Sequence, residues 1–104
     1  MKMCDEMIKL RQALDEKGVQ WKDCSTIYPD DEIRDTMRKL NVSRECADCS
    51  MFRTHFSYRG YFYSVIYGYG SYGYYDGKLE CMVGDKEPVG SMTAEDVLKL
   101  MEGK

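Results

Sequence analysis

FRTHFSYRGYFYSVIY, residues 52–67, is the stretch that decides the fold. Aromatic and β-branched residues, which favour strands, fill both sides of the dipeptide Arg59-Gly60, and this pattern predicts two antiparallel strands around a tight turn. Arg-Gly is a weaker turn signal than Asn-Gly, so a longer loop with a bulge stays open as an alternative. In the two-residue register Tyr58 faces Tyr61. Three further pairs then lie on the same face, namely Phe56 with Tyr63, Thr54 with Val65, and Phe52 with Tyr67.

The other residues of this hairpin share the opposite face, because side chains alternate between the two sides of a strand. We therefore expect the aromatic face to form the core and the polar face to meet solvent. The polar face carries Arg53, His55 and Ser57 on one strand, opposite Ile66, Ser64 and Phe62 on the other.

A second hairpin is predicted downstream, where Asp76-Gly77 is a strong two-residue turn signal. It would join a strand at residues 72–75 to a strand at residues 78–83, in which Leu79, Cys81 and Val83 alternate as an inward set. These three residues lie on the core face only if the alternation of inward and outward side chains shifts by one residue before this strand. We therefore expect a β-bulge among the glycines at positions 68, 70 and 73.

Helical patterns begin and end the chain. Apolar residues at helical spacing predict a first helix over residues 3–17, which Gly18 ends as a left-handed cap. A last helix is predicted from Thr93, which forms a capping box with Asp96, to Gly103. Both helices carry a single apolar stripe, so each should pack on the sheet with one side.

Between the first helix and the hairpin we expect an extended segment over residues 19–27 and a helix that begins at Pro29 and ends near Asn41. The order of elements is then α-β-α-β-β-β-α. This order predicts an α+β fold in which residues 1–104 form one domain. Its sheet would be mostly antiparallel, with about four strands and the helices packed on one face.

The composition is that of a globular protein of small net charge. Of the 104 residues 43% are hydrophobic, and 18 acidic against 15 basic side chains give a net charge of −3. Direct nucleic-acid binding needs a basic surface and is therefore not expected. The first residues lack the continuous apolar stretch of a signal peptide or membrane span, which predicts a cytoplasmic protein without a membrane partner.

The five cysteines offer a candidate metal site. In the cytoplasm they would remain thiols, and Cys46 and Cys49 form a C-x-x-C with His55 six residues further on. Cys24 or Cys81 could supply the fourth ligand that tetrahedral zinc needs. No second C-x-x-C completes a familiar spacing, so ordinary thiols are the preferred interpretation and no cofactor is expected. A zinc-stabilised interaction module stays open as an alternative.

The run from Gly68 to Gly73, through Gly70, matches the letters G-x-G-x-x-G. Dinucleotide binding also requires a helix whose N-terminus receives the pyrophosphate, whereas a turn and a strand are predicted to follow here. A nest of backbone N–H groups could still bind an anion without a helix. A small protein that sequesters a nucleotide or another anion is therefore a second alternative.

His55 is the only histidine, so any acid–base or triad chemistry would have to use it. Ser64 lies opposite His55 in the predicted register, but no acidic residue occurs between Ser50 and Tyr75 to orient the imidazole. We therefore expect no enzymatic activity.

The tyrosines suggest recognition instead of catalysis. Tyrosine is enriched at protein interfaces, because a rigid ring with a polar tip gives contact area at a small entropic cost. Of the nine, Tyr69 and Tyr75 lie near predicted loops and are the two that we most expect to be exposed. A homodimer, with a second subunit over the polar face, stays open. The predicted binding surface consists of Arg53, His55, Arg59, Tyr69, Ser71, Tyr72 and Tyr75.

Several of these motifs resemble small uncharacterised proteins encoded by bacteriophages and prophages. The resemblance includes Arg53-Thr-His-Phe56, the run Tyr63–Gly73, Gly77-Lys-Leu-Glu80 and Thr93-Ala-Glu-Asp-Val97. The segments Leu10–Val19 and Glu87–Gly90 are similar as well. The likeness covers most of the chain outside residues 29–50, and it carries no catalytic residues.

The resemblance implies a setting in the cytoplasm of a bacterial host. Small accessory phage proteins often disarm host defences or redirect host machinery by binding. We therefore expect a phage-derived accessory protein that binds a host protein, such as an inhibitor of a defence effector in the manner of an anti-CRISPR.

Overall fold

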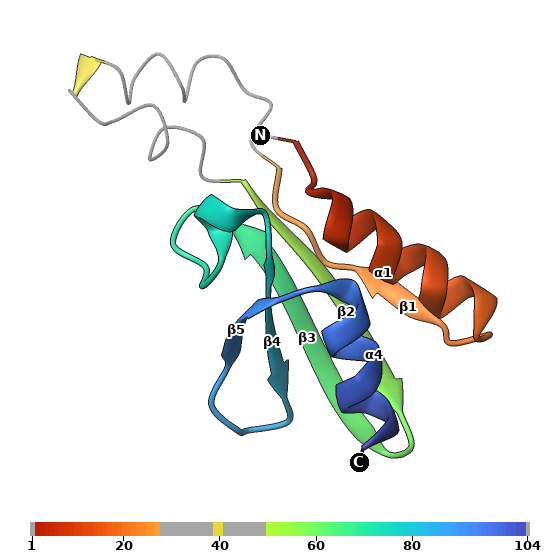
Figure 1. The fold of residues 1–104 in the computed structure, drawn as a ribbon. Coiled ribbons are helices and arrows are strands. Elements are labelled where there is room, and N and C mark those ends of the chain that lie inside the picture. The colour runs from red at the N-terminus through yellow and green to blue at the C-terminus, as the bar shows by residue number, and fades with distance from the viewer. Residues whose placement is uncertain (1, 28–38, 41–49, 104) are drawn as a thin grey trace.

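A five-stranded antiparallel sheet with helices on one face forms the fold of this α+β protein (Figure 1). The computed structural model describes residues 2–27, 39–40 and 50–103. The strand order β1-β2-β3-β4-β5 follows the chain, so every described neighbour pair is antiparallel. The elements are α1 (Asp5–Glu16), β1 (Trp21–Asp23), β2 (Met51–Tyr58), β3 (Tyr61–Gly68), the 3₁₀ turn η1 (Tyr74–Asp76), β4 (Leu79–Val83), β5 (Val89–Met92) and α4 (Ala94–Glu102).

The β2–β3 hairpin has the predicted register. Tyr58 pairs with Tyr61, and the pairing continues without a shift to Met51 and Gly68. Arg59 has a φ of 51° and Gly60 a φ of 84°, the two left-handed residues that a tight two-residue hairpin turn needs. The turn therefore forms although its first residue is arginine.

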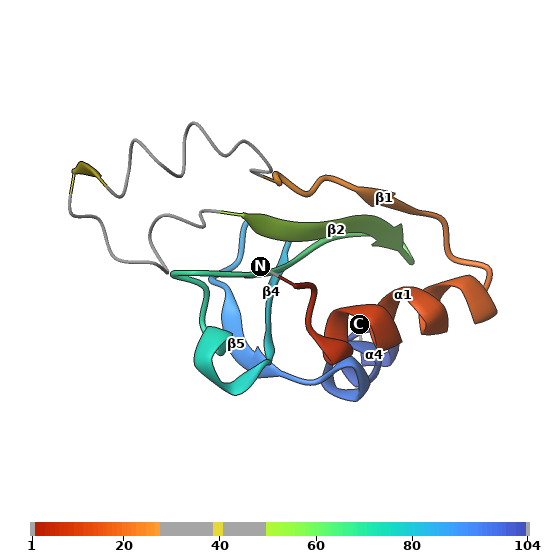
Figure 2. The ribbon, with the colours of Figure 1, turned by 90° about the horizontal axis from the view of Figure 1, so that it is seen from above.

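The core lies between the aromatic face of the sheet and the two described helices. Figure 2 places α1 and α4 on the same side of β1 and β2. Phe56 and Tyr63 stack in parallel at 4.9 Å between ring centroids, within the buried face that the hairpin pattern predicts. The buried hydrophobic residues are Met7, Leu10, Leu14, Phe52, Phe56, Tyr63, Val65, Leu79, Cys81, Val83, Ala94, Val97 and Met101.

The helix ends agree with the sequence signals. Gly18 follows α1 with a φ of 73°. At α4 the Thr93 hydroxyl accepts from the Asp96 N–H at 3.1 Å, and the Asp96 carboxylate accepts from the Thr93 N–H at 3.0 Å. These reciprocal bonds form the capping box.

The predicted hairpin at Asp76-Gly77 is wrong. Residues 74–76 form the turn η1, and β4 pairs with β3, with Val83 opposite Tyr63. In this pairing the inward residues of β3 and β4 are in phase, so the bulge expected among the glycines 68–73 is not needed. The irregular register lies instead between β4 and β5, a strand that was not predicted and that brings the sheet to five strands.

Two predictions fall on residues that the structure does not describe. They are the helix from Pro29 to near Asn41, apart from residues 39–40, and the C-x-x-C pair Cys46 and Cys49. In the described part of the chain, no helix has the length and apolar character to cross a membrane.

Candidate functional site

A compact loop leads from β3 to β4 and includes η1; we call residues 69–77 the tyrosine loop (Figure 1). Ser71 fixes its first turn. The Ser71 hydroxyl accepts from the Gly68 N–H at 3.0 Å and donates to the Gly68 carbonyl at 2.7 Å. Ser71 is itself buried, so this predicted binding residue shapes the loop from within and is not presented to a partner.

Further contacts hold the loop against β4 and β5. The Tyr72 N–H donates to the Glu80 carboxylate at 3.0 Å, and the Lys78 N–H donates to the Gly73 carbonyl at 2.9 Å. Gly73 has a φ of 93°, and a Cβ at this position would lie 3.0 Å from the backbone of Ser91 in β5. The loop is therefore closely packed and has a defined shape.

The hydrogen-bonded loop presents tyrosine rings to solvent. Tyr74 is the centre of the cluster, with ring centroids 5.5 Å from Tyr67, 5.9 Å from Tyr69 and 5.1 Å from Tyr75. Tyr75 is 81% exposed and Tyr72 is 63% exposed. Large rings that remain exposed on an ordered loop are typical anchors of protein interfaces.

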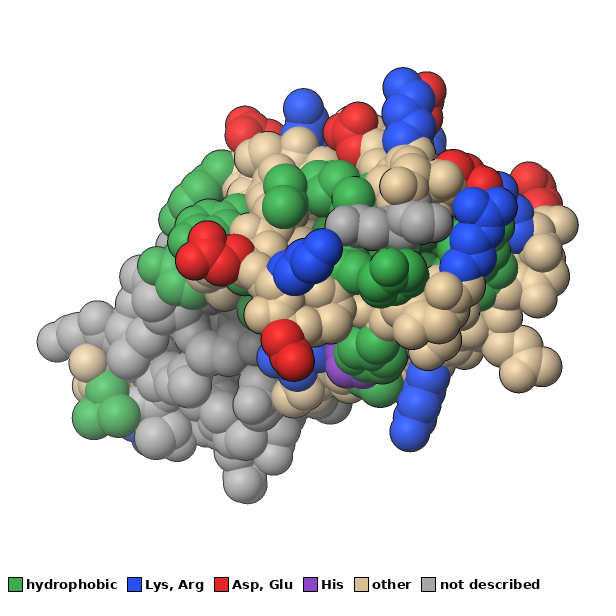
Figure 3. Space-filling view, turned by 90° about the horizontal axis from the view of Figure 1, so that it is seen from below, with side chains coloured by type: hydrophobic (Ala, Val, Ile, Leu, Met, Phe, Trp, Pro, Cys, Tyr) green, Lys and Arg blue, Asp and Glu red, His purple; other side chains and the backbone are tan. Residues whose placement is uncertain are grey.

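The second candidate surface is the face of the sheet that points away from α1 and α4. We call it the open face, and Figure 3 shows hydrophobic side chains beside the histidine there. Phe62 is 46% exposed and Met82 36% exposed. By strand register the open face comprises Lys22 of β1, Arg53, His55 and Ser57 of β2, Phe62, Ser64 and Ile66 of β3, and Glu80 and Met82 of β4.

His55 lies in the middle of the open face. Its Nε2 is 3.0 Å from the Ser64 hydroxyl, and its ring meets Phe62 edge-on at 5.2 Å. Burial lowers the pKa of His55, and the positive charges of Arg53 and Lys22 lower it further. These effects favour a neutral imidazole near pH 7, and the bond to Ser64 crosses between the two strands in the predicted register.

The predicted binding residues separate into three places. Tyr69, Ser71, Tyr72 and Tyr75 belong to the tyrosine loop, and Arg53 and His55 belong to the open face. Arg59 lies in the β2–β3 turn beside the end of α4, at the opposite end of β3 from the loop (Figure 1). Its guanidinium is 3.1 Å from the Glu102 carboxylate, so Arg59 ties the hairpin to α4.

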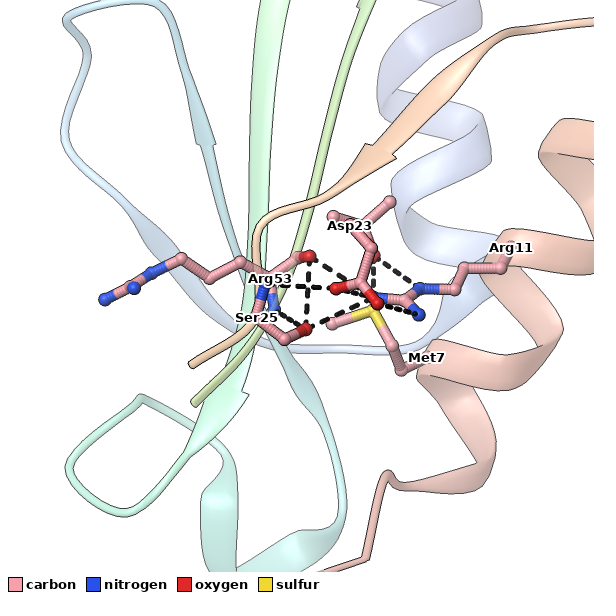
Figure 4. Close-up of polar contacts among 6 residues, drawn as sticks. Met7, Arg11, Asp23, Ser25 and Arg53 are labelled. Atoms are coloured by element: carbon pink, nitrogen blue, oxygen red, sulfur yellow. Dashed lines mark hydrogen bonds and ion pairs between the residues drawn. The ribbon is translucent and has the colours of Figure 1, made fainter. Parts of the chain in front are cut away.

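A network around Arg11, which the sequence patterns did not indicate, aligns β1 with β2 beneath the open face (Figure 4). The Arg11 side chain donates to the Thr54 hydroxyl at 2.8 Å and to the Arg53 carbonyl at 3.2 Å, and it lies 3.2 Å from the Asp23 carboxylate. Figure 4 shows the Arg53 side chain extending to the other side of the sheet. This network joins α1 to both strands through backbone and side-chain acceptors, and strand alternation directs the Arg53 side chain to the open face.

The described candidates for metal binding do not converge. Cys81 is buried on the core face, where burial raises the pKa of its thiol to about 12, whereas His55 lies on the open face. The sheet separates the two side chains, so they cannot ligate one ion. Within the described ranges no group of three or more potential ligands is close enough to hold a metal.

Half of the N–H groups in the glycine-rich run are already bonded within the protein. Three of its N–H groups donate to groups of the same chain: Gly68 to Ser71, Ser71 to the Gly68 carbonyl, and Tyr72 to the Glu80 carboxylate. The helical element that directly follows the run is the three-residue turn η1, after which the chain enters β4. A phosphate would therefore have to displace internal acceptors, one of them an anion.

Comparisons of the chain with protein-family models, curated proteins and solved structures return no match. The two surfaces must therefore be interpreted from their own chemistry.

Proposed function

We propose that this protein is a non-enzymatic binding protein that recognises a host protein through the tyrosine loop. The observation that carries the proposal is the exposure of Tyr72 and Tyr75 on a backbone held by Ser71, Glu80 and Gly73. Exposed rings on a preformed loop lose little conformational entropy on binding, so much of their contact area contributes to affinity.

A protein partner suits this surface better than an anion or a nucleic acid. The loop carries several phenol rings and the carboxylate of Asp76, and the N–H groups of Gly68, Ser71 and Tyr72 are bonded within the chain. Phenols combine apolar contact with a hydrogen-bonding tip, which matches the mixed chemistry of protein surfaces.

The biological setting that we propose is counter-defence in a bacterial host. The proposal rests on the resemblance of the chain to small phage and prophage proteins. The partner would then be a cytoplasmic defence effector, such as a CRISPR nuclease complex, whose working surface is blocked by the bound protein.

Phage challenge of bacteria that carry single defence systems tests this function. Cells that express the native protein should lose protection by one system, and the double variant Tyr72→Ala/Tyr75→Ala should leave protection intact. Tyr61→Ala is the matched control, because Tyr61 is 44% exposed but lies at the other end of β3. Circular dichroism verifies that both variants fold.

Two results would refute the proposal. One is that no defence system is inhibited and no host protein binds the native chain in a reconstituted assay. The other is that Tyr61→Ala abolishes inhibition while the double loop variant retains it.

A further inference from the structure

One row of side chains crosses the open face with opposite charges at its ends. Arg53 of β2 pairs with Ile66 of β3, and Ile66 pairs in turn with Glu80 of β4. The three side chains therefore lie in line on one face as cation, apolar centre and carboxylate. Neighbouring strands are about 4.8 Å apart, so the side chains of Arg53 and Glu80 leave the backbone at similar distances on either side of Ile66.

Both charged groups keep capacity for an external partner. In the described part of the chain the Arg53 guanidinium makes no ion pair, and Figure 4 shows it pointing away from α1. Glu80 uses Oε1 to accept from the Tyr72 N–H, which leaves its second oxygen for another donor. A half-buried arginine with no ion pair among the described residues and an acceptor oxygen thus lie on the same row.

This row is complementary to itself under a twofold rotation. When two open faces meet with their β3 strands superposed and parallel, the rotation places β2 of one copy over β4 of its partner. Arg53 of each copy then faces Glu80 of the other, and Ile66 meets its own counterpart on the axis. Two equivalent ion pairs flank one apolar contact.

The rest of the open face fits the same arrangement. Phe62 lies on β3 near the axis, and Met82 of one copy comes over His55 of the other. Phe62 and Met82 are partly exposed apolar side chains in a single chain, and a partner sheet would cover both.

We propose that two copies of this chain dimerise through their open faces, about a twofold axis that runs along β3. The two sheets would lie about 10 Å apart, the usual spacing of sheets packed face to face. A second copy explains why the charges lie symmetrically about Ile66, which an unrelated protein would not require. A nucleic acid is disfavoured by Glu80 and by the net charge of −3.

Charge-swap variants test this geometry by sedimentation velocity over a wide range of concentrations. The native chain should dimerise. Arg53→Glu alone and Glu80→Arg alone should each weaken dimerisation at least about tenfold, because each places like charges in both contacts. An equimolar mixture of the two variants should dimerise again, because the heterodimer restores both pairs.

Two further variants complete the design. Ile66→Asp places two carboxylates together on the axis and should give a monomer whose circular dichroism is native. Lys86→Glu makes the same charge change as Arg53→Glu in the exposed β4–β5 turn, away from the open face, and should dimerise like the native chain.

The proposal is overturned if the native chain is monomeric at every concentration. It is also overturned if the native chain dimerises but Arg53→Glu and Ile66→Asp dimerise equally well, since the interface then lies elsewhere. A mixture of folded single variants that stays monomeric would exclude the twofold pairing of Arg53 with Glu80.

Discussion

At the scale of single residues, Arg11 connects more of the fold than any local pattern indicates. Its side chain is only 12% exposed, lies 4.6 Å from the Trp21 ring centroid and bonds to both Thr54 and the Arg53 carbonyl. A charged donor in such a site satisfies acceptors that would otherwise be left in the half-buried space between α1 and β2.

Replacement of Arg11 should therefore destabilise the protein. We expect Arg11→Met to lower the free energy of unfolding by about 2 kcal/mol, because the hydrogen bonds to a charged group are lost while the apolar stem is kept. Urea denaturation measures the change. Lys9→Met on the same helix is the control and should change stability by less than about 0.5 kcal/mol, since Lys9 is exposed. Equal losses in both variants would contradict the structural role of Arg11.

For Tyr63 we predict the opposite effect on stability, because its replacement should not destabilise the protein. Its ring is fully buried, and its hydroxyl has no hydrogen-bond partner among the described residues. Burial raises the pKa of this phenol. Tyr63→Phe removes an unsatisfied polar atom, so we expect unchanged stability or a gain of up to about 1 kcal/mol in thermal or urea unfolding. Tyr58→Phe loses a 3.0 Å hydrogen bond to Glu102 and should not gain stability. A clear loss in Tyr63→Phe would indicate a partner for its hydroxyl.

The lowered pKa of His55 predicts how the stability of the protein depends on pH between 7 and 5. Burial and the charges of Arg53 and Lys22 lower the pKa of His55 in the folded state below its ordinary value of about 6.5. As pH falls, the unfolded chain binds the proton first, so the free energy of unfolding decreases through this window and levels off below the folded pKa. His55→Gln should flatten this part of the urea-stability profile. An unchanged slope in the variant would refute the assignment.

At the scale of elements, the two hairpin predictions had opposite outcomes. Residues 52–67 have strand-forming residues on both sides of the turn, and local pattern and long-range burial there favour the same register. At Asp76-Gly77 the local turn signal was outweighed, because β4 buries Leu79, Cys81 and Val83 best beside β3. The glycines before it have positive φ at Gly70 and Gly73, and they form a loop instead of a strand.

A matched pair of glycines tests how far β5 holds the loop. Gly70 and Gly73 have similar φ values of 88° and 93°, but only at Gly73 would a Cβ meet the backbone of Ser91. Gly70→Ala should lower the free energy of unfolding by about 1 kcal/mol, because alanine is strained in the left-handed backbone conformation. Gly73→Ala should lower the free energy of unfolding, measured with urea, by more than Gly70→Ala does. It should also speed amide hydrogen exchange in β5. Equal effects of the two substitutions would show that the contact with Ser91 does not support the loop.

At the scale of the whole molecule, the sequence predicts which residues share a face better than it predicts which lie together in space. Strand alternation separated the core face from the open face correctly, because it depends only on neighbours in the chain. Strand alternation cannot predict which residues of different elements lie close together in space. Arg59 was grouped with the tyrosines but lies at the far end of β3, and Glu80, which fixes both the loop and the charged row, belongs to a strand whose partner was mispredicted.

The two proposed surfaces together predict a bivalent molecule. A twofold axis parallel to β3 preserves the strand direction, so both tyrosine loops, each at the end of β3, would project from the same end of the dimer. Linked sites can bind a multivalent partner more tightly than single sites do, by about 100-fold or more. In the phage challenge, Ile66→Asp should therefore inhibit defence only at higher expression, whereas Tyr72→Ala/Tyr75→Ala should fail at every level. If Ile66→Asp is monomeric and yet as potent as Lys86→Glu, each loop acts alone.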